Sequence, residues 1–225
     1  GGTGKTPFSI FLADELKNKG KNPVIVRKHY KNHYDEHLMI KSKFKELILN
    51  KSRIDGINDA IKTGFDLVIM DDGFQERKIL KKINIICFNQ GQKLGNGMII
   101  PSGPLRESLS SLKNVQIVII NGEKDQDFEN KIFEINKNIS IFYTQYVPIN
   151  INNFKNKNLF AVAGIGNPEN FFNLLYKNNL KIFKKFFFPD HYEFKRSEIL
   201  DILKEAENNN CKLILTEKDF YRIKK

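Results

Sequence analysis

Runs of consecutive apolar residues, many of them β-branched, recur along this chain. They read "PVIVR", "DLVIMDD", "INIICF", "VQIVIING", "NLFAVAGIG" and "CKLILTEKD". Continuous apolar runs of this kind are expected of parallel strands that are buried on both faces. Stretches with helical periodicity lie between several of these runs, at residues 8–19, 53–63, 168–178 and 195–208. The alternation predicts an α/β fold with a mainly parallel sheet flanked by helices.

The composition changes within residues 122–158, which are rich in Asn, Lys and Glu and have irregular apolar spacing. We interpret this stretch as a connection between two lobes. The 225 residues suffice for one large domain or two smaller lobes. We therefore expect a core lobe over residues 1–148 and a smaller C-terminal α/β lobe over residues 149–225.

The chain begins with "GGTGKTP", which resembles the end of a phosphate-binding loop, G-x-x-x-x-G-K-[ST]. In such a loop, backbone N–H groups and the N-terminus of the following helix bind phosphate oxygens. Lys5 would then contact the β- and γ-phosphates, and the Thr6 hydroxyl would ligate Mg²⁺. The opening glycine of the motif would precede Gly1, so we expect a fragment that starts inside its own motif. The alternative is a flexible terminus before an ordinary helix.

A second acidic element follows the strand-like run "FDLVIMDDGFQ". A strand-end Asp is the residue with which phosphate-loop enzymes hold Mg²⁺ opposite their Lys and Ser/Thr. Asp71 and Asp72 both qualify, and the sequence does not rank them. The alternative is a turn, because Asp-Gly is a strong turn signal.

The net charge of +11 favours an anionic partner: nucleic acid, an acidic membrane surface or a phosphorylated substrate. No basic cluster interleaved with aromatic residues is present, so we expect no nucleic-acid partner. The two cysteines lie in apolar runs and are expected to be buried, reduced thiols. No apolar run approaches the ~20 residues that span a bilayer.

Two further groups of residues leave alternatives open. The histidines at 29, 33 and 37 are spaced as on one helix face, but solvated loop residues are the favoured interpretation over a metal site. Residues 217–219, "EKD", follow a strand-like run. They either face a cleft or form a solvated turn.

Taken together, the motifs of this chain resemble those of one enzyme family. The stretches "GGTGKTP", "DEHLMI", "MDDGFQ", "LGNGMIIPSGPLRE", "VAGIGNPENFF", "FPDHYEF" and "LTEKD" occur in the order found in the tetraacyldisaccharide 4′-kinase (lipid A 4′-kinase) family. The resemblance covers nearly the whole chain. It implies a P-loop NTPase-like core lobe and a smaller α/β lobe. It also implies transfer of the γ-phosphate of ATP to the 4′-hydroxyl of tetraacyldisaccharide 1-phosphate, in lipid A biosynthesis.

The resemblance implies ATP and Mg²⁺ as cofactors, and a lipid substrate and an anionic membrane surface as partners. It places the protein at the cytoplasmic face of the bacterial inner membrane. The family is usually anchored by an N-terminal apolar helix, which would precede Gly1. Both ends of the family's chain are therefore expected to be missing.

The resemblance also assigns roles to individual residues. Asp35 would be the general base for the sugar hydroxyl, and His191 would pair with it. Lys5 would act on the phosphates. Asp71 and Asp72 would serve the metal and its surroundings. The residues expected to bind the nucleotide are Gly1, Gly2, Thr3, Gly4, Lys5, Thr6 and Arg106, and those expected to serve the metal are Thr6, Asp71, Asp72 and Glu107.

This chain departs from the family around Asp35. The family's "SRGYGG" reads "VRKHYKNH" here, so that Arg27 and Tyr30 remain and the glycines are lost. Two other functions stay open from the residues: a P-loop switch ATPase of the partitioning or metallochaperone type, and a basic binding module without catalysis. Lys5, Thr6 and the two aspartates argue against the second.

Overall fold

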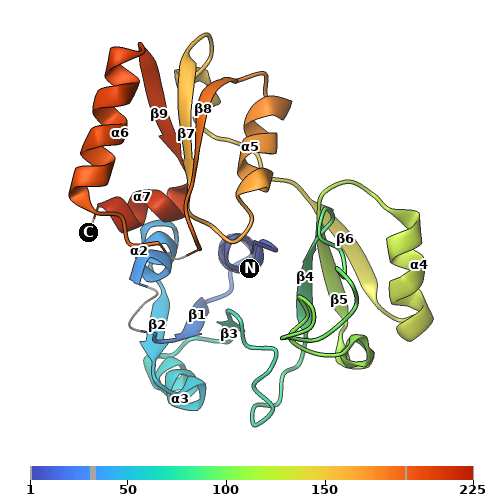
Figure 1. The fold of residues 1–225 in the computed structure, drawn as a ribbon. Helices are drawn as coiled ribbons and strands as arrows, with labels where there is room; N and C mark the ends of the chain where they lie inside the picture. Colours follow the sequence, from blue (N-terminus) through green and yellow to red (C-terminus); the bar gives the residue numbers. More distant parts are fainter. Residues whose placement is uncertain (1, 31–33, 191, 225) are drawn as a thin grey trace. The chain divides into compact units, whose positions relative to one another are not determined.

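The computed structural model describes residues 2–30, 34–190 and 192–224 (Figure 1). The α-helices in these residues are α1 (Lys5–Asn18), α2 (Tyr34–Lys43), α3 (Arg53–Thr63), α4 (Gln126–Ile135), α5 (Pro168–Lys177), α6 (Arg196–Asn208) and α7 (Glu217–Ile223). Short 3₁₀ helices are η1 (Leu109–Asn114) and η2 (Ile151–Asn153). The strands are β1 (Pro23–Lys28), β2 (Leu47–Asn50), β3 (Leu67–Met70), β4 (Ile85–Asn89), β5 (Ile117–Asn121), β6 (Ser140–Thr144), β7 (Asn158–Ala163), β8 (Lys181–Phe187) and β9 (Cys211–Leu215).

The chain forms two compact units. The N-terminal unit consists of Thr3–Arg27 and Ser52–Tyr146. The C-terminal unit groups Lys28–Lys51 and Val147–Lys225 with the first two residues. The two units are defined by which residues lie in contact with one another. The division into lobes 1–148 and 149–225 stays a prediction.

In the N-terminal unit, β1 pairs with β3 in parallel, with Val26 opposite Met70. A second parallel sheet has the order β4-β5-β6. Its core combines strand residues with one side of α4, because Phe128 and Ile132 of that helix are almost fully buried. The buried core residues here are Phe88, Leu112, Val115, Val118, Ile120, Phe128, Ile132 and Ile139.

In the C-terminal unit, the parallel sheet has the order β8-β7-β9. Alternate side chains of the central strand β7 point to opposite faces. Figure 1 shows α5 and α6 on opposite faces of this sheet. One core groups Leu159, Ala161 and Ala163 with Phe172 and Leu175 of α5. The other groups Phe160 and Val162 with Ile202 and Ala206 of α6. Burial on both faces explains why the sequence of β7 is continuously apolar.

These pairings confirm the predicted α/β fold with parallel strands and flanking helices. The predicted helices at 53–63, 168–178 and 195–208 are present with shifts of at most one residue at either end. Helix α1 begins at Lys5, three residues before the predicted start. Pro7 is compatible with this position, because the first N–H groups of a helix have no intrahelical acceptor.

Residues 122–158 differ from the expected connection. They contain α4 and β6, and most of them belong to the N-terminal unit. Asp125 caps α4 by accepting a hydrogen bond from the Phe128 N–H, and Phe128 and Ile132 are spaced to lie on the same side of the helix. A regular amphipathic helix is therefore present within a stretch whose overall composition is polar.

Candidate active site

The phosphate-loop motif ends in a left-handed glycine at the start of α1. Gly4 has φ +87° and is the N-terminal capping residue, and the Phe8 N–H donates to its carbonyl oxygen at 3.0 Å. A Cβ atom at Gly4 would lie 3.3 Å from Asn121 Nδ2 and 3.3 Å from the Tyr146 hydroxyl oxygen. Lys5 and Thr6 thus occupy the first turn of the helix, where unpaired N–H groups and the helix dipole favour an anion.

The carboxylate of Asp71 lies against this first turn. Asp71 directly follows β3 and is only 1% exposed. It accepts hydrogen bonds from Thr6 Oγ1 at 3.0 Å and Ser9 Oγ at 3.2 Å, and from Arg27 Nη1 at 2.6 Å. Arg27 comes from the end of β1, which is paired with β3, so both residues reach the same edge. The guanidinium and the two hydroxyls compensate the buried carboxylate charge.

The neighbouring carboxylate, Asp72, makes a different set of contacts. Its backbone is left-handed, with φ 56°, and its side chain is 33% exposed. Arg106 Nη1 lies 2.9 Å from both carboxylate oxygens, and Lys5 Nζ lies 3.9 Å from Oδ1. The Asp72 carbonyl oxygen accepts a hydrogen bond from Arg53 Nη2 at 2.7 Å. The structure therefore distinguishes two aspartates that the sequence did not rank. Asp71 contacts Thr6, whereas Asp72 contacts Lys5 and Arg106.

Carboxylate and hydroxyl oxygens are suitable ligands for Mg²⁺, which is commonly held by one or two carboxylates together with substrate phosphates. The 3.0 Å contact between Thr6 Oγ1 and Asp71 Oδ2 places two such donors together. In the described residues no group of three or more His, Cys, Asp or Glu side chains forms a metal site. The residues thus fit an ion whose remaining ligands come from a nucleotide and water.

Two further side chains, those of Cys87 and Tyr146, lie near Lys5 and Gly4. Burial raises the pKa of the Cys87 thiol to about 11, against a smaller lowering by the charge of Lys5. Burial also raises the pKa of Tyr146, whose hydroxyl lies near Gly4. Both groups are therefore neutral at physiological pH, and Lys5 is the cation next to this part of the loop. Cys87 is half-buried and Cys211 buried, and both are free thiols as expected.

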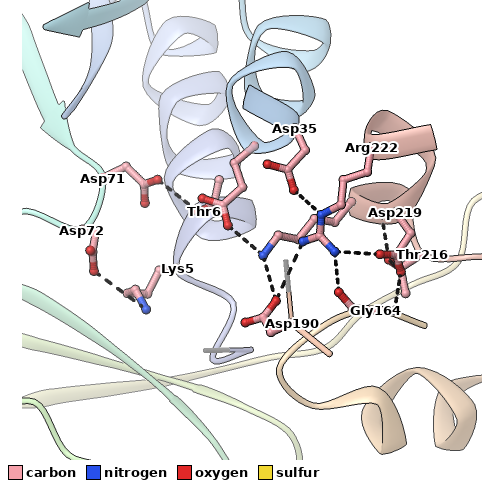
Figure 2. Close-up of polar contacts among 12 residues, drawn as sticks. Lys5, Thr6, Asp35, Asp71, Asp72, Gly164, Asp190, Thr216, Asp219 and Arg222 are labelled. Atoms are coloured by element: carbon pink, nitrogen blue, oxygen red, sulfur yellow. Dashed lines mark hydrogen bonds and ion pairs between the residues drawn. The ribbon is translucent and has the colours of Figure 1, made fainter. Parts of the chain in front are cut away.

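Asp35 lies in the C-terminal unit, in the first turn of α2, and is 6% exposed. Its Oδ2 accepts a hydrogen bond from Arg222 Nε at 2.7 Å (Figure 2). Asp35 and Arg222 also line a cavity of about 860 Å³, whose walls are Tyr34, Glu193, Phe194, Arg196, Ile199, Leu200, Tyr221 and Ile223. The expected base is thus an aspartate that is paired through one oxygen and borders an open space.

The short helix α7 supplies most of the contacts around Asp35. Arg222 Nη1 donates to the Gly164 carbonyl oxygen and, at 3.0 Å, to Asp219 Oδ1. Lys218 Nζ lies 2.9 Å from Glu36 Oε1 and 3.4 Å from Asp190 Oδ1. Asp219 is fully buried, so residues 217–219 begin a helix and do not form a solvated turn.

Sequence reasoning did not identify Arg222, Arg27 or Ser9 as members of these clusters. Arg222 and Asp35 are 187 residues apart, which no local pattern reveals. One available signal was the position of "TEKD" after a buried strand, since ligands in α/β folds gather at the carboxyl ends of strands.

The remaining predicted residues are less informative. Glu107 is partly buried and makes no hydrogen bond or ion pair within the described ranges. Gly1 and His191 lie outside the described residues. Among the histidines, His37 belongs to α2, is 5% exposed and stacks on His29 with ring centroids 5.4 Å apart. The interpretation as solvated loop histidines is therefore wrong for His37; His33 lies outside the described residues.

None of the helices in the described residues combines the length and apolar character needed to cross a bilayer.

Comparisons with known proteins identify the family. The family profile "Tetraacyldisaccharide-1-P 4′-kinase" matches residues 1–225. The chain is 38% identical over 226 residues to the tetraacyldisaccharide 4′-kinase of Pelagibacter ubique, covering 99% of this chain and 72% of that protein. It is 34% identical to the enzyme of the same name from Legionella pneumophila strain Corby, covering 97% of this chain and 70% of that protein.

A solved structure agrees with the fold. The crystal structure of the apo form of LpxK from Aquifex aeolicus in complex with ATP superposes with a TM-score of 0.68 at 23% identity, covering 99% of this chain and 76% of that one. With a family match along the whole sequence and relatives above 30% identity, this chain belongs to the tetraacyldisaccharide-1-P 4′-kinase family.

Proposed function

We propose that this protein is a kinase that transfers the γ-phosphate of ATP to the 4′-hydroxyl of tetraacyldisaccharide 1-phosphate, a step of lipid A biosynthesis. The observation that carries this proposal is the family match over residues 1–225, which includes every motif of the candidate site. The N-terminal unit supports it, because the first turn of α1 brings Lys5 and Thr6 next to two strand-end aspartates.

In this proposal the loop from Gly1 to Thr6 binds the phosphates of ATP through backbone N–H groups. Lys5 binds the β- and γ-phosphate oxygens, and Arg106 is a second cation for them. Both cations lie at the carboxylate of Asp72, which holds them in place before the nucleotide arrives.

Thr6 and Asp71 are the residues we propose to hold Mg²⁺, with Asp72 and Glu107 as further acidic groups around it. Bound Mg²⁺ would neutralise negative charge on the transferring phosphate. Arg27 and Ser9 keep the Asp71 carboxylate directed toward Thr6, since each donates a hydrogen bond to it.

Asp35 is the proposed general base that accepts the proton of the sugar hydroxyl, and His191 is its proposed partner. Phosphoryl transfer depends mainly on positioning and on stabilisation of charge, so one well-placed carboxylate is sufficient for the proton. Asp35 lines a cavity, which supports the proposal that the sugar hydroxyl can reach its carboxylate.

We further propose that the protein acts at the cytoplasmic face of the bacterial inner membrane, where its lipid substrate and ATP meet. The net charge of +11 supports contact with an anionic membrane surface. Nucleic acid is not a proposed partner.

The switch-ATPase alternative is not favoured, because the matched family and the relatives named above are kinases.

The direct test is a transfer assay. The full-length protein is incubated with Mg²⁺, ATP labelled at the γ-phosphate, and tetraacyldisaccharide 1-phosphate in detergent micelles. Label is expected on the lipid, and Lys5→Ala should reduce its transfer by at least about 100-fold, because an electrostatic contact to the reacting phosphate is lost.

Lys62→Ala removes an exposed lysine from the last turn of α3 and is the matched control, with transfer expected to stay near wild type. ATP hydrolysis without labelled lipid, stimulated by a protein partner, would instead favour the switch-ATPase function.

A further inference from the structure

The pairing of Asp35 with Arg222 has a consequence for the proton-transfer step. We propose that Arg222 is a positioning residue, which holds the Asp35 carboxylate in the orientation needed to accept the hydroxyl proton. This inference rests on the proposed function, and in particular on Asp35 as the base. It adds a residue from the last helix of the structure, α7, to the machinery of the reaction.

Arg222 is itself held by groups that do not belong to α2. Its Nη1 donates to the carbonyl oxygen of Gly164, directly after β7, and to Asp219 Oδ1. Asp219 in turn accepts hydrogen bonds through Oδ2 from the Gly164 N–H at 2.9 Å and from Thr216 Oγ1 at 2.6 Å (Figure 2). The guanidinium is therefore anchored at the ends of two neighbouring strands, β7 and β9. Groups supported by a sheet are held more rigidly than groups on a loop.

The two carboxylates bound by Arg222 are used differently. Asp219 is fully buried and has hydrogen bonds to both oxygens, as expected of a structural carboxylate. Asp35 is bound through Oδ2, and in the part of the chain that the structure describes no hydrogen bond reaches its Oδ1. Because Asp35 also lines the cavity, one oxygen is fixed by Arg222 and the other is left to bind a substrate hydroxyl.

The charges around Arg222 also favour a functional role for the pair. Asp35 at 2.7 Å, Asp219 at 3.0 Å and Asp190 at 3.8 Å all approach this one guanidinium, which is 7% exposed. Lys218 supplies a second positive charge near Asp190. A site that needed Arg222 for stability alone would be satisfied by Asp219 and the Gly164 carbonyl. The additional buried carboxylate at position 35 costs desolvation energy and is explained by a use of its Oδ1, to which none of the described residues donates a hydrogen bond.

The hydroxyl oxygen of the acceptor forms a bond to the γ-phosphorus, and the bond from that phosphorus to the β,γ-bridging oxygen breaks, leaving the electron pair on ADP. The hydroxyl proton moves to Asp35 Oδ1. Throughout this step Arg222 keeps Oδ2 in place, so that Oδ1 faces the hydroxyl.

The test compares Arg222→Gln, Arg222→Lys and the control Lys204→Gln in the full-length protein. Lys204 is an exposed residue of α6 in the same unit, and its replacement makes the same change of charge. We expect Arg222→Gln to lower kcat about 100-fold, as misplacement of a reacting group does. KM for ATP should change by less than about twofold, because Lys5, Thr6 and Arg106, which are proposed to bind ATP and its Mg²⁺, lie in the other unit. Arg222→Lys should recover at least about tenfold of the loss by restoring the charge.

A double-mutant cycle separates positioning from a general structural effect. In an Asp35→Ala background, Arg222→Gln should cause no further loss of kcat. An equal loss with and without Asp35 would overturn the inference, and so would wild-type kcat in Arg222→Gln. If Arg222→Gln unfolds, Asp219→Asn with Arg222→Gln removes one buried carboxylate together with the guanidinium. This double variant should regain part of the melting temperature that Arg222→Gln loses, while kcat stays low.

The outcomes also separate this role from the proposed function. A wild-type protein that transfers no label to the lipid would refute the function and this role together. A wild-type protein that transfers label, with Arg222→Gln equally active, would refute the role of Arg222 alone.

Discussion

At the scale of single residues, the left-handed backbone of Gly4 predicts how a substitution there changes stability and ATP affinity. Gly4→Ala places a Cβ at φ +87°, 3.3 Å from both Asn121 Nδ2 and the Tyr146 hydroxyl oxygen. The strained backbone should cost about 1–2 kcal/mol of stability. A shift of the loop away from these neighbours should also weaken ATP binding by at least about tenfold, because in the proposed function the backbone N–H groups of the loop bind the phosphates. Urea unfolding and calorimetric titration of ATP measure the two effects.

Gly64 provides the control for this prediction. It has φ +86° at the C-terminal end of α3, and a Cβ there would meet no atom within 4 Å. Gly64→Ala should therefore lose similar stability and keep ATP affinity. A Gly4→Ala variant that binds ATP as well as Gly64→Ala would show that the loop does not bind the phosphates closely.

Local motifs indicated which residues gather at the start of α1 better than they indicated the partners of these residues. Lys5, Thr6 and Asp71 follow from the spacing of the motif and from a strand that ends in acid. The arginines that hold the carboxylates could not be found this way. Arg27 contacts Asp71 across 44 residues and Arg222 contacts Asp35 across 187. Such pairs are set by how the strands are ordered and by which strand ends lie side by side, which the local pattern does not encode.

At the scale of secondary structure, the N-terminal cap of α4 gives the next prediction. The Asp125 side chain accepts a hydrogen bond from the Phe128 N–H at 3.0 Å and pairs with Lys93. The hydrogen bond from Lys93, followed by that from Phe128, lowers the pKa of Asp125 below its ordinary value of 3.8. Because the folded pKa is the lower one, this stabilisation is present above pH 3.8 and is lost as the pH falls through the folded value.

Three variants of this helix separate the cap from the ion pair. Asp125→Ala removes both and should lower the melting temperature by about 2–6 °C. Asp125→Asn keeps a capping oxygen but loses the charge, so its loss should be smaller and should nearly vanish in high salt, whereas Asp125→Ala should keep the part of its loss that comes from the cap. Asp127→Asn, at an exposed residue of the first turn, is the control. Equal melting temperatures for wild type and Asp125→Ala by circular dichroism would refute the cap.

The helices predicted correctly and those missed differ in a physical way. Helices α5 and α6 have several apolar residues at helical spacing and bury them against β7, so the pattern is strong. Helix α4 buries only Phe128 and Ile132 as apolar residues, together with the charged Glu129, so its apolar face is short and lies within a polar stretch. Helix α2 begins with acidic residues and ends with lysines, and it is positioned partly by ion pairs to α7. Tertiary contacts, more than propensity, therefore determine the weaker helices.

At the scale of the whole molecule, the fold class followed from the alternation of buried strands and helices, whereas the grouping of segments did not. Residues 28–51 join residues 147–225 in one compact unit, although more than ninety residues separate them in sequence. The contacts that join these segments include the pairs of α2 with α7, such as Lys43 with Glu217 at 2.8 Å. The boundaries of this unit depend on contacts between segments that are distant in sequence. Composition alone therefore could not predict them.

The net charge of +11 belongs to the same scale and predicts how the protein meets a membrane. Lys and Arg residues near an anionic bilayer contribute about 1 kcal/mol each, and salt screens this attraction. The full-length protein should therefore sediment with vesicles that contain about 30% phosphatidylglycerol, and the bound fraction should fall several-fold between about 0.05 and 0.5 M NaCl. Pure phosphatidylcholine vesicles of the same size are the control and should bind less. Equal binding to both vesicle types, unchanged by salt, would show that the net positive charge does not bring this protein to an anionic membrane surface.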